Sequence, residues 1–417
     1  MNSEVIVLAR PFIGIRPVSG RADDIAAPPY DVVNTEEARA IAKGRPLSFF
    51  HVSRAEIDLP ADTDPYSEDV YKTAAQNLKK LEASGAVIRD PSLCFYVYRI
   101  TANGHAQTGV AFSASVDAYN CKRIKKHELT RPSKEDDRVR QIEAVNAITG
   151  PVLAVHRARA DLEALLASAS SRAPDAVAAN VDGACHELWV VSDEDAVATI
   201  GNAINSMDEI YIADGHHRSA AGCRVAKRRR NNNPGHKGTE AYNGFLAVSF
   251  PDDQVTILDY NRVVKDLNNL DAEAFKSALS ETYRIFPASN PVRPKSAGTF
   301  GMYLDGQWSL IKPIVPEENE DPVKKLDVQL LSRSILSPLL GIGDQRTDNR
   351  IDFVGGSRGP QEIARRVDSG EMQIGFTLYP TSLADLMDVA DADMIMPPKS
   401  TWFEPKLADG MIWLPLD

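Results

Sequence analysis

The sequence predicts an α+β protein. Strand-like and helix-like runs are interspersed along the chain, and several neighbouring strand-like runs are joined by short hairpin signals. A purely parallel sheet would instead need a crossover segment between its strands. The chain contains no internal repeat and no low-complexity tract. Its length allows two or three domains. We expect an N-terminal α/β segment at 1–120, a core at 121–268 and a C-terminal α/β segment at 269–417.

Prolines, an amphipathic helix and a hairpin mark the first segment. Pro28 and Pro29 force extended backbone. One helix is expected to begin at Thr35, and another over 67–83 has its apolar residues at helical spacing on one face. Two strands joined by a hairpin turn are expected to follow, at 94–100 and 107–119.

The middle segment joins a highly charged stretch, residues 121–142, to short strands and helices. Apolar residues at the end of this stretch and just beyond it give an amphipathic helix. The other expected elements are strands at 151–156, 187–192, 210–213 and 244–250, helices at 161–168 and 219–229, and a strand at 255–260 that pairs with 244–250 in a hairpin.

The last segment is expected to contain a third hairpin and four helices. Asp305 and Gly306 predict a tight turn between strands 302–304 and 308–311. The acidic, proline-marked stretch 313–322 is expected to be a loop or linker. The other expected elements are helices at 272–279, 323–340, 361–367 and 382–389 and a strand at 373–378.

The composition is that of a soluble globular protein, with 43% hydrophobic and 25% charged residues. A net charge of −11 argues against direct nucleic-acid binding, which needs a broad basic face. No apolar run approaches the length of a membrane span, and residues 1–10 are too short for a signal-peptide core. The four cysteines are far apart and form no C-x-x-C pair. We therefore expect a cytoplasmic protein without a disulfide framework.

The most informative stretch lies where a strand-like run meets a helix-like run, at residues 208–219. It contains Asp214, Gly215, His216, His217 and Arg218. A helix start offers unpaired N–H groups and a partial positive charge, which suit an anion. The arginine fork matches a pair of phosphate oxygens, and the glycine lets a ligand approach the backbone. We interpret this junction as a phosphate cradle; the alternative is a turn with a hydrogen-bonded histidine pair.

A second group of ionisable residues lies upstream, in Lys126-His127-Glu128 and the charged run that follows. Glu128 beside His127 is a reasonable general base. Such a density of charge is also typical of a solvated face. The two interpretations stay open at this point.

Three further motifs supply candidate contacts to a ligand. They contain Asp31, the pair Asn261 and Arg262, and the triplet Lys399, Ser400 and Thr401. The triplet offers three donors in a row for phosphate oxygens, or else belongs to a proline-rich wrap around the C-terminal part. The pair would position a substrate at the end of a strand, or form a turn. The aspartate would face a substrate, or belong to a rigid turn.

These motifs resemble those of one large prokaryotic family that carries a domain of unknown function. In chain order they are Ala-Pro-Pro-Tyr-Asp-Val, Lys-His-Glu-x-Thr, Ala-Asp-Gly-His-His-Arg, Asp-Tyr-Asn-Arg and Met-Pro-Pro-Lys-Ser-Thr-x-Phe-x-Pro-Lys, within residues 10–417. Residues 126–221 are also similar to the ParB/sulfiredoxin superfamily, in particular its free-serine kinases. In those proteins a Pro-His-Glu-type segment, a helix, a strand and an Asp-Gly-His-His-Arg turn follow in this order. Lys126 replaces the proline here.

The resemblance implies a ParB/sulfiredoxin-like nucleotide-binding core and a small-molecule kinase. Such an enzyme would use ATP or ADP with Mg²⁺ to phosphorylate a hydroxyl, free L-serine being the first candidate acceptor. The residues from Gly215 to Arg218 would hold the phosphates. Glu128, with His127 beside it, would take the hydroxyl proton, and Asp214 would orient metal or substrate. The partners would be a small-molecule substrate and a nucleotide, and a homodimer is left open.

Two other functions are weighed beside the kinase. A non-catalytic, ParB-like regulator would bind a nucleotide at the same cradle without needing Glu128. A metal-dependent hydrolase would use His216 and His217 as ligands. Adjacent histidines at a helix start diverge by about 100°, which argues against their sharing one ion. No H-E-x-x-H, P-loop or complete dinucleotide fingerprint occurs in the sequence.

Overall fold

The chain forms two units, which divide at Val255 and Pro405. Unit 1 holds the residues up to 255 together with 405–417, and unit 2 holds 256–404. The computed structural model describes residues 6–316 and 320–417. This division differs from the three expected segments. The expected boundary after residue 120 falls within one sheet, because β5 (His105–Ser115) pairs with β12 (Gly244–Pro251).

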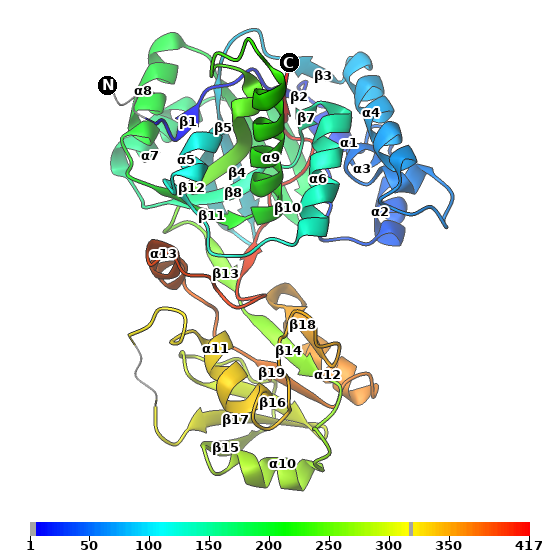
Figure 1. Ribbon diagram of the computed structural model, residues 1–417, viewed down its shortest axis with the longest axis vertical. Helices are drawn as coiled ribbons and strands as arrows, with labels where there is room; N and C mark the ends of the chain where they lie inside the picture. The colour runs from blue at the N-terminus through cyan, green and yellow to red at the C-terminus, as the bar shows by residue number, and fades with distance from the viewer. Residues whose placement is uncertain (1–5, 317–319) are drawn as a thin grey trace. The chain divides into compact units, whose positions relative to one another are not determined.

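Unit 1 is built on a mixed sheet (Figure 1). Within the described residues it has nine strands, in the order β6-β11-β8-β12-β5-β4-β10-β9, with β1 paired to β5. The strands are β1 Ala9–Arg10, β4 Phe95–Ala102, β5, β6 Ile124–Lys125, β8 Val152–His156, β9 Ala176–Val181, β10 Ala184–Val191, β11 Ile210–Asp214 and β12. The strands β2 Ile15–Pro17, β3 Val87–Arg89, β7 Ala147–Ile148 and β21 Leu414–Pro415 form two short ladders, β2 with β3 and β7 with β21.

The helices of unit 1 flank this sheet and build an N-terminal lobe. They are α1 Ala22–Ile25, α2 Thr35–Ala42, α3 Phe50–Ser53, α4 Glu68–Ala83, α5 Val116–Asn120, α6 Pro132–Val145, α7 Ala160–Ala169, α8 Glu194–Asn205 and α9 His216–Asn232, with 3-10 turns η1 Ala55–Asp58 and η2 Ala241–Asn243. The α6 and α9 helices lie side by side (Figure 1), and α9 packs on β12 and β8. The first four helices enclose a separate apolar cluster that includes Phe49, Phe50, Leu78 and Trp413.

Local signals explain why the predicted elements of unit 1 form. The α2 helix begins with a capping box between Asn34 and Glu37, and α4 buries the apolar face that the sequence predicts. The β4–β5 hairpin turns at Asn103 and Gly104, whose φ angles are 51° and 78°. Both values fit a type I′ turn.

The edge of the sheet positions the candidate site. The β6 strand runs parallel to β11, with Ile124 opposite Ile210 and Lys125 opposite Tyr211. Neighbouring parallel strands end at the same edge, so the residues after Lys125 and those after Asp214 emerge together. The β8 strand is antiparallel to β11, so its start lies at the same edge, with Leu153 opposite Asp214.

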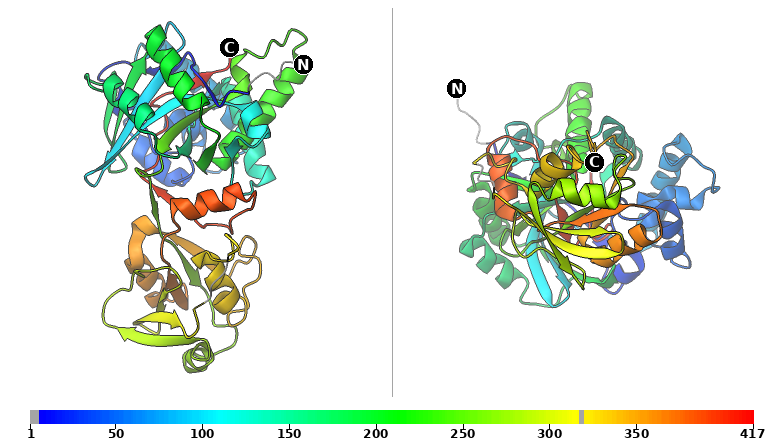
Figure 2. Two further views of the ribbon diagram at one scale, coloured as in Figure 1. Left: turned by 90° about the vertical axis from the view of Figure 1, so that its left-hand side faces the viewer. Right: turned by 90° about the horizontal axis from the view of Figure 1, so that it is seen from below.

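Unit 2 is built on a second sheet (Figure 2). Within the described residues its six strands follow the order β15-β17-β16-β19-β14-β18, while β13 pairs with β20. The elements are β13 Thr256–Leu258, β14 Tyr260–Val264, α10 Ala272–Leu279, β15 Tyr283–Ala288, β16 Phe300–Leu304, β17 Gln307–Pro313, α11 Asp327–Leu331, η3 Ser332–Leu336, β18 Ile351–Gly355, η4 Gly356–Arg358, α12 Gly359–Asp368, β19 Ile374–Thr377, α13 Leu383–Asp391 and β20 Trp402–Glu404. Its core contains Val263, Tyr303, Trp308 and Ile363.

Most element predictions are confirmed, and three need correction. The hairpin between 244–250 and 255–260 is wrong, because β12 pairs with β5 and β8 whereas β13 pairs with β20. The expected helix 323–340 is limited to α11 and the π-helical turn η3. The helix expected after residue 218 already begins at His216. Part of the expected loop 313–322, residues 317–319, and the first five residues of the chain lie outside the described residues.

In the described part of the chain, none of the helices combines the length and the apolar character that crossing a membrane requires.

Candidate functional site

The β11–α9 junction makes a sharp, unprotected helix start. Gly215 has φ 98° and ψ 29°, the left-handed region that glycine adopts without steric cost. A Cβ on this residue would lie 3.0 Å from Arg218 Nε, so a side chain here would require Arg218 to shift. Among the described residues no side chain caps α9. Its first N–H groups therefore remain available to an anion.

Asp214 ends β11 between two cations. Its Oδ2 lies 3.4 Å from both Lys406 Nζ and Arg218 Nη2, and its Oδ1 accepts the Gly215 N–H at 3.0 Å. Burial acts to raise the pKa of the Asp214 carboxyl, but Lys406 and Arg218 outweigh it and hold this pKa well below its usual range. Asp214 is therefore ionised, and its charge is already compensated within the chain.

Arg218 is buried, and its guanidinium group is held by protein atoms rather than exposed to a ligand. Its Nη1 donates to the Pro151 carbonyl and its Nη2 faces Asp214. A Cβ on Gly150 would lie 3.1 Å from Arg218 Cδ, so the backbone closes over the side chain. Burial acts to lower the pKa of Arg218, but Asp214 and Asp31 raise it, so the charge is retained. The expected bidentate clasp of a phosphate by this arginine is thus corrected: the fork already has partners.

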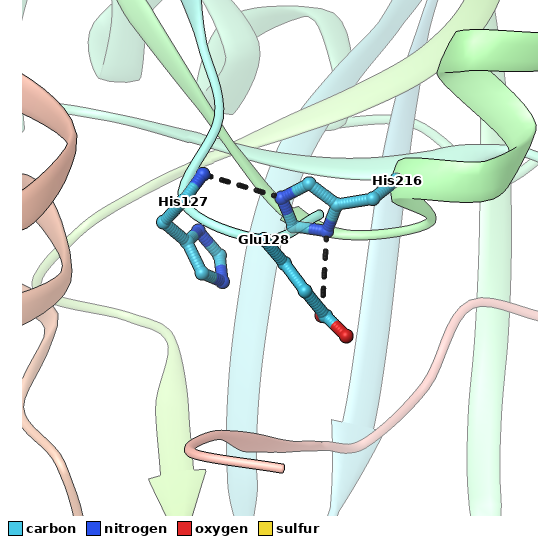
Figure 3. A group of neighbouring side chains, drawn as sticks. All are labelled: His127, Glu128 and His216. Atoms are coloured by element: carbon cyan, nitrogen blue, oxygen red, sulfur yellow. Dashed lines mark hydrogen bonds and ion pairs between the residues drawn. The ribbon is translucent and has the colours of Figure 1, made fainter. Parts of the chain in front are cut away.

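Two buried histidines and a carboxylate meet beside the helix start (Figure 3). The rings of His127 and His216 are 4.5 Å apart and nearly perpendicular. The Nε2 of His216 lies 3.5 Å from the backbone N–H of His127, and its Nδ1 lies 3.8 Å from Glu128 Oε2. The expected neighbours His127 and Glu128 are therefore brought to the junction, as the parallel β6–β11 pairing requires.

Burial keeps these histidines neutral. It lowers the pKa of His127 to about 4, against a backbone contact with Ile212 and the charge of Asp214, which act in the other direction. Burial, followed by the charge of His127, lowers the pKa of His216 well below its ordinary value. Both rings are therefore neutral near pH 7.

His217 has a different neighbourhood from His216. Its Nε2 accepts the backbone N–H of Arg131 at 3.0 Å. Burial lowers its pKa, with Glu135 and Asp31 opposing the shift. The two adjacent histidines thus diverge, which excludes the ligand pair weighed for a metal-dependent hydrolase.

Arg218 also lines a small cavity. Its walls include Tyr30, Ser53, Arg138, Gln141, Gly150 and Asp409. The Arg138 guanidinium lies 3.9 Å from the centre of the Tyr30 ring. Burial raises the pKa of Asp409 to about 7, with Arg218 acting to lower it and Asp31 to raise it. Asp31 itself is exposed, and its charge acts on Arg218, His217 and Asp409, so it lies near this junction.

The expected contacts in unit 2 are mostly structural. Asn261 and Arg262 are 0% exposed, which corrects their expected role in holding a substrate. Asn261 donates to Asp259 and accepts the Leu378 N–H, and Arg262 donates to the carbonyls of Pro398 and Lys399. These bonds satisfy buried polar groups and hold the loop before β20.

Of the triplet Lys399, Ser400 and Thr401 in unit 2, the serine hydroxyl is already engaged within the protein. The Ser400 hydroxyl donates to the Pro397 carbonyl at 2.7 Å, so it is not offered to phosphate as expected. Lys399 has φ 57°, and its ammonium lies 5.5 Å from the centre of the Tyr260 ring. Thr401 is half-buried.

Sequence reasoning missed four residues of the unit 1 site: Tyr30, Arg138, Lys406 and Asp409. Tyr30 and Lys406 stand within the quoted motifs, beside Asp31 and at the end of the proline-rich segment, so a signal existed for both. Arg138 sits in a charged run that reads as a solvated face. Asp409 follows the motifs and has no local signal.

Comparison with known proteins gives a family and distant structural likenesses. No curated protein matches the chain. A conserved hypothetical protein from Pyrococcus furiosus is 14% identical, with 72% of this chain and 93% of that chain covered and a TM-score of 0.34. A free serine kinase in complex with AMP is 13% identical (71% and 86% covered, TM-score 0.33). SbnI with a C-terminal truncation, from Staphylococcus aureus, is 12% identical (72% and 85% covered, TM-score 0.36).

The family model described as "Protein of unknown function (DUF1015)" matches residues 9–329. This confirms the resemblance to a family with a domain of unknown function. The matched range ends before the proline-rich segment at 396–406, so that motif lies outside it. Because the match covers well over half of the 417 residues, the chain belongs to the DUF1015 family.

Proposed function

We propose that the chain is a nucleotide-dependent kinase that phosphorylates a hydroxyl of a small molecule, with L-serine as the first acceptor to test. One observation carries the proposal: a partly exposed carboxylate lies beside an uncapped helix start. Glu128 Oε2 is 3.8 Å from His216 Nδ1, and His216 opens α9. Phosphoryl transfer asks for these two features together, a group that accepts the hydroxyl proton and a cradle for the phosphates.

The cradle would act mainly through the backbone. The N–H groups of the first turn of α9 would donate to the phosphate oxygens, and the helix dipole adds to their attraction. Lys406 supplies a cation within 3.4 Å of Asp214 at the same junction. A ParB/sulfiredoxin-like core, with the nucleotide bound at this turn, remains part of the proposal.

Asp214 does not fit the magnesium ligand that the sequence predicts, because Lys406 and Arg218 already balance its charge. We assign it instead the positioning of these two cations. Mg²⁺, bound to the nucleotide's own phosphate oxygens, would supply charge neutralisation.

The proposed step is a direct transfer. Glu128 accepts the proton of the acceptor hydroxyl while the hydroxyl oxygen attacks the terminal phosphorus of ATP or ADP. A bond forms between this oxygen and the phosphorus, and the bond from phosphorus to the bridging oxygen of the nucleotide breaks. The nucleotide leaves with one phosphate fewer, as ADP or AMP.

The test is a transfer assay with labelled ATP and labelled ADP against a panel of amino acids and sugars. We expect Glu128→Gln to reduce turnover by about 100-fold or more, the scale on which general bases act. Glu143→Gln is the matched control, since Glu143 of α6 pairs with Arg228 in the C-terminal part of α9 rather than with a residue at its start. Absence of any phosphorylated product with wild-type protein, or full activity in Glu128→Gln, contradicts the proposal.

A non-catalytic nucleotide-binding regulator is the second candidate, and the engaged fork of Arg218 favours it. An arginine that already donates to Pro151 and faces Asp214 is less able to follow charge that develops during transfer. Calorimetry separates the two candidates. Tight nucleotide binding without turnover by wild-type protein, unchanged in Glu128→Gln, supports the regulator.

A further inference from the structure

His127, Glu128 and His216 bring three metal-ligating groups into one small volume. Each offers one ligand atom, and these atoms all lie within 4.8 Å of one another. The ring of His127 and the carboxylate of Glu128 point to the same side of the His216 ring (Figure 3). The three residues come from two segments, the one that follows β6 and the start of α9, which the parallel β6–β11 pairing brings side by side.

The two imidazoles are buried without strong hydrogen bonds. Neither ring nitrogen of His127 has a hydrogen bond of ordinary geometry within residues 6–316 and 320–417. The contact of His216 Nε2 with the His127 N–H, at 3.5 Å, is at the long limit for such a bond. Buried polar nitrogens are normally satisfied by a protein group, a water or an ion, and among the described residues the His127 ring has only the backbone contact with Ile212, so it is suited to bind an ion.

We propose that His127, Glu128 and His216 form a binding site for one divalent transition-metal ion such as Zn²⁺. Two imidazole nitrogens and one carboxylate oxygen form the protein ligand set of many catalytic zinc centres, and they leave at least one position open. Imidazole favours first-row transition metals over Mg²⁺, which prefers oxygen ligands. The site is thus separate in chemistry from a magnesium ion that arrives with a nucleotide.

The three groups need a modest contraction to bind an ion. Tetrahedral ligands about 2.1 Å from a metal are about 3.4 Å from one another, and the present separations reach 4.8 Å. The Glu128 side chain is 42% exposed and can rotate, whereas that of His216 is 4% exposed and fixed. The carboxylate would therefore move toward the two rings.

The metal site goes beyond the proposed kinase and does not depend on it. Its link to phosphoryl transfer does rest on that function. One carboxylate oxygen of Glu128 would bind the ion, and the other would still accept a proton, because a carboxylate has lone pairs on both oxygens. The open position would face the start of α9, where phosphate oxygens are expected.

The experiment uses the full chain, freed of metal by a chelator and titrated with Co²⁺ in the absence of nucleotide. Cobalt bound by nitrogen and oxygen ligands reports through its visible absorption, and Zn²⁺ competition gives the affinity. We expect one equivalent of Co²⁺ per chain, displaced by Zn²⁺ and not by millimolar Mg²⁺. Glu128→Ala and His216→Asn should each weaken binding by about 100-fold. His217→Asn is the matched control, because His217 also opens α9 but bonds to Arg131.

Two results would overturn the site. One is wild-type protein that binds neither Co²⁺ nor Zn²⁺ in stoichiometric amount. The other is binding that Glu128→Ala leaves unchanged, a variant that removes an exposed side chain and so keeps the core intact. A kinase assay without turnover leaves both readouts unaffected, so the two proposals fail separately.

Discussion

At the scale of single residues, burial and close charged partners together set the pKa values of the groups around Arg218. Asp214, Lys406 and Arg218 form a chain of alternating charges at the junction. Asp409 is buried near the same arginine, and burial raises its pKa to about 7. The pKa of the Asp214 carboxyl is therefore shifted down, whereas that of the Asp409 carboxyl is shifted up.

Replacing Asp409 by Asn should remove a pH dependence of stability. An unfolded aspartate ionises near pH 4, whereas this one keeps its proton to about pH 7 in the native state. Its stabilising contribution is thus complete below about pH 4 and is lost as pH rises to about 7, by up to about 4 kcal/mol. Urea unfolding of both proteins should be measured from pH 4 to 8. The free energy of unfolding of Asp409→Asn should rise relative to that of wild type as the pH increases through this window. Parallel curves would refute the prediction.

Lys406→Met should weaken nucleotide binding by about tenfold, because a charge-assisted contact of this kind contributes about 1.4 kcal/mol. It should also raise the pKa of Asp214, which loses one of its two cations. Isothermal titration with ADP measures the first effect. Lys227→Met, at an exposed position farther along α9, is the control and should bind normally. Equal affinity in both variants would remove Lys406 from the site.

At the scale of elements, the site is created by the order of strands at one edge of the sheet. The β6 and β11 strands are parallel neighbours, so the segments that follow them meet although about 85 residues lie between them. The α9 helix then starts abruptly because Gly215 takes a left-handed conformation. A change at this residue acts on the whole junction.

Gly215→Ala should destabilise the protein more than Gly104→Ala does. Both positions have positive φ, which costs a residue with a Cβ about 1–2 kcal/mol. At Gly104 nothing lies within 4 Å of the new Cβ, whereas at Gly215 it meets Arg218 Nε at 3.0 Å. Because Arg218 is held by Pro151, the clash should add about 1 kcal/mol or more. Free energies of unfolding in urea measure the difference. Equal losses of stability in the two variants would show that Arg218 moves aside without cost.

At the scale of the whole molecule, the chain enters unit 2 once and leaves it once. Thr256 lies opposite Glu404 in the β13–β20 pair, so the entry and the exit are adjacent. Unit 2 also has an apolar core of its own. Two of the five motifs meet in this unit, where Arg262 holds the loop at Pro398 and Lys399.

The segment 256–404 should fold as an independent domain. Its ends are tied by β13 and β20, and among the described residues its sheet contains no strand from unit 1. The isolated segment should unfold cooperatively in calorimetry, with the near-ultraviolet circular dichroism of packed aromatic residues. The complementary chain, with a short Gly-Ser linker joining Val255 to Pro405, should stay folded. A fragment without a cooperative transition would show that unit 2 depends on the rest of the chain.

The sequence by itself determined the local features of this protein. Apolar spacing, caps and turn residues predict α4, the β4–β5 hairpin and the β11–Gly215–α9 junction, because each depends on residues a few positions apart. The tertiary structure alone decided which distant residues meet. It brought His127 to His216, placed Lys406 beside Asp214 and Asp409 beside Arg218, and enclosed Asn261 and Arg262 in a core. Strand order and burial set these contacts, and neither leaves a trace in the spacing of residues along the chain.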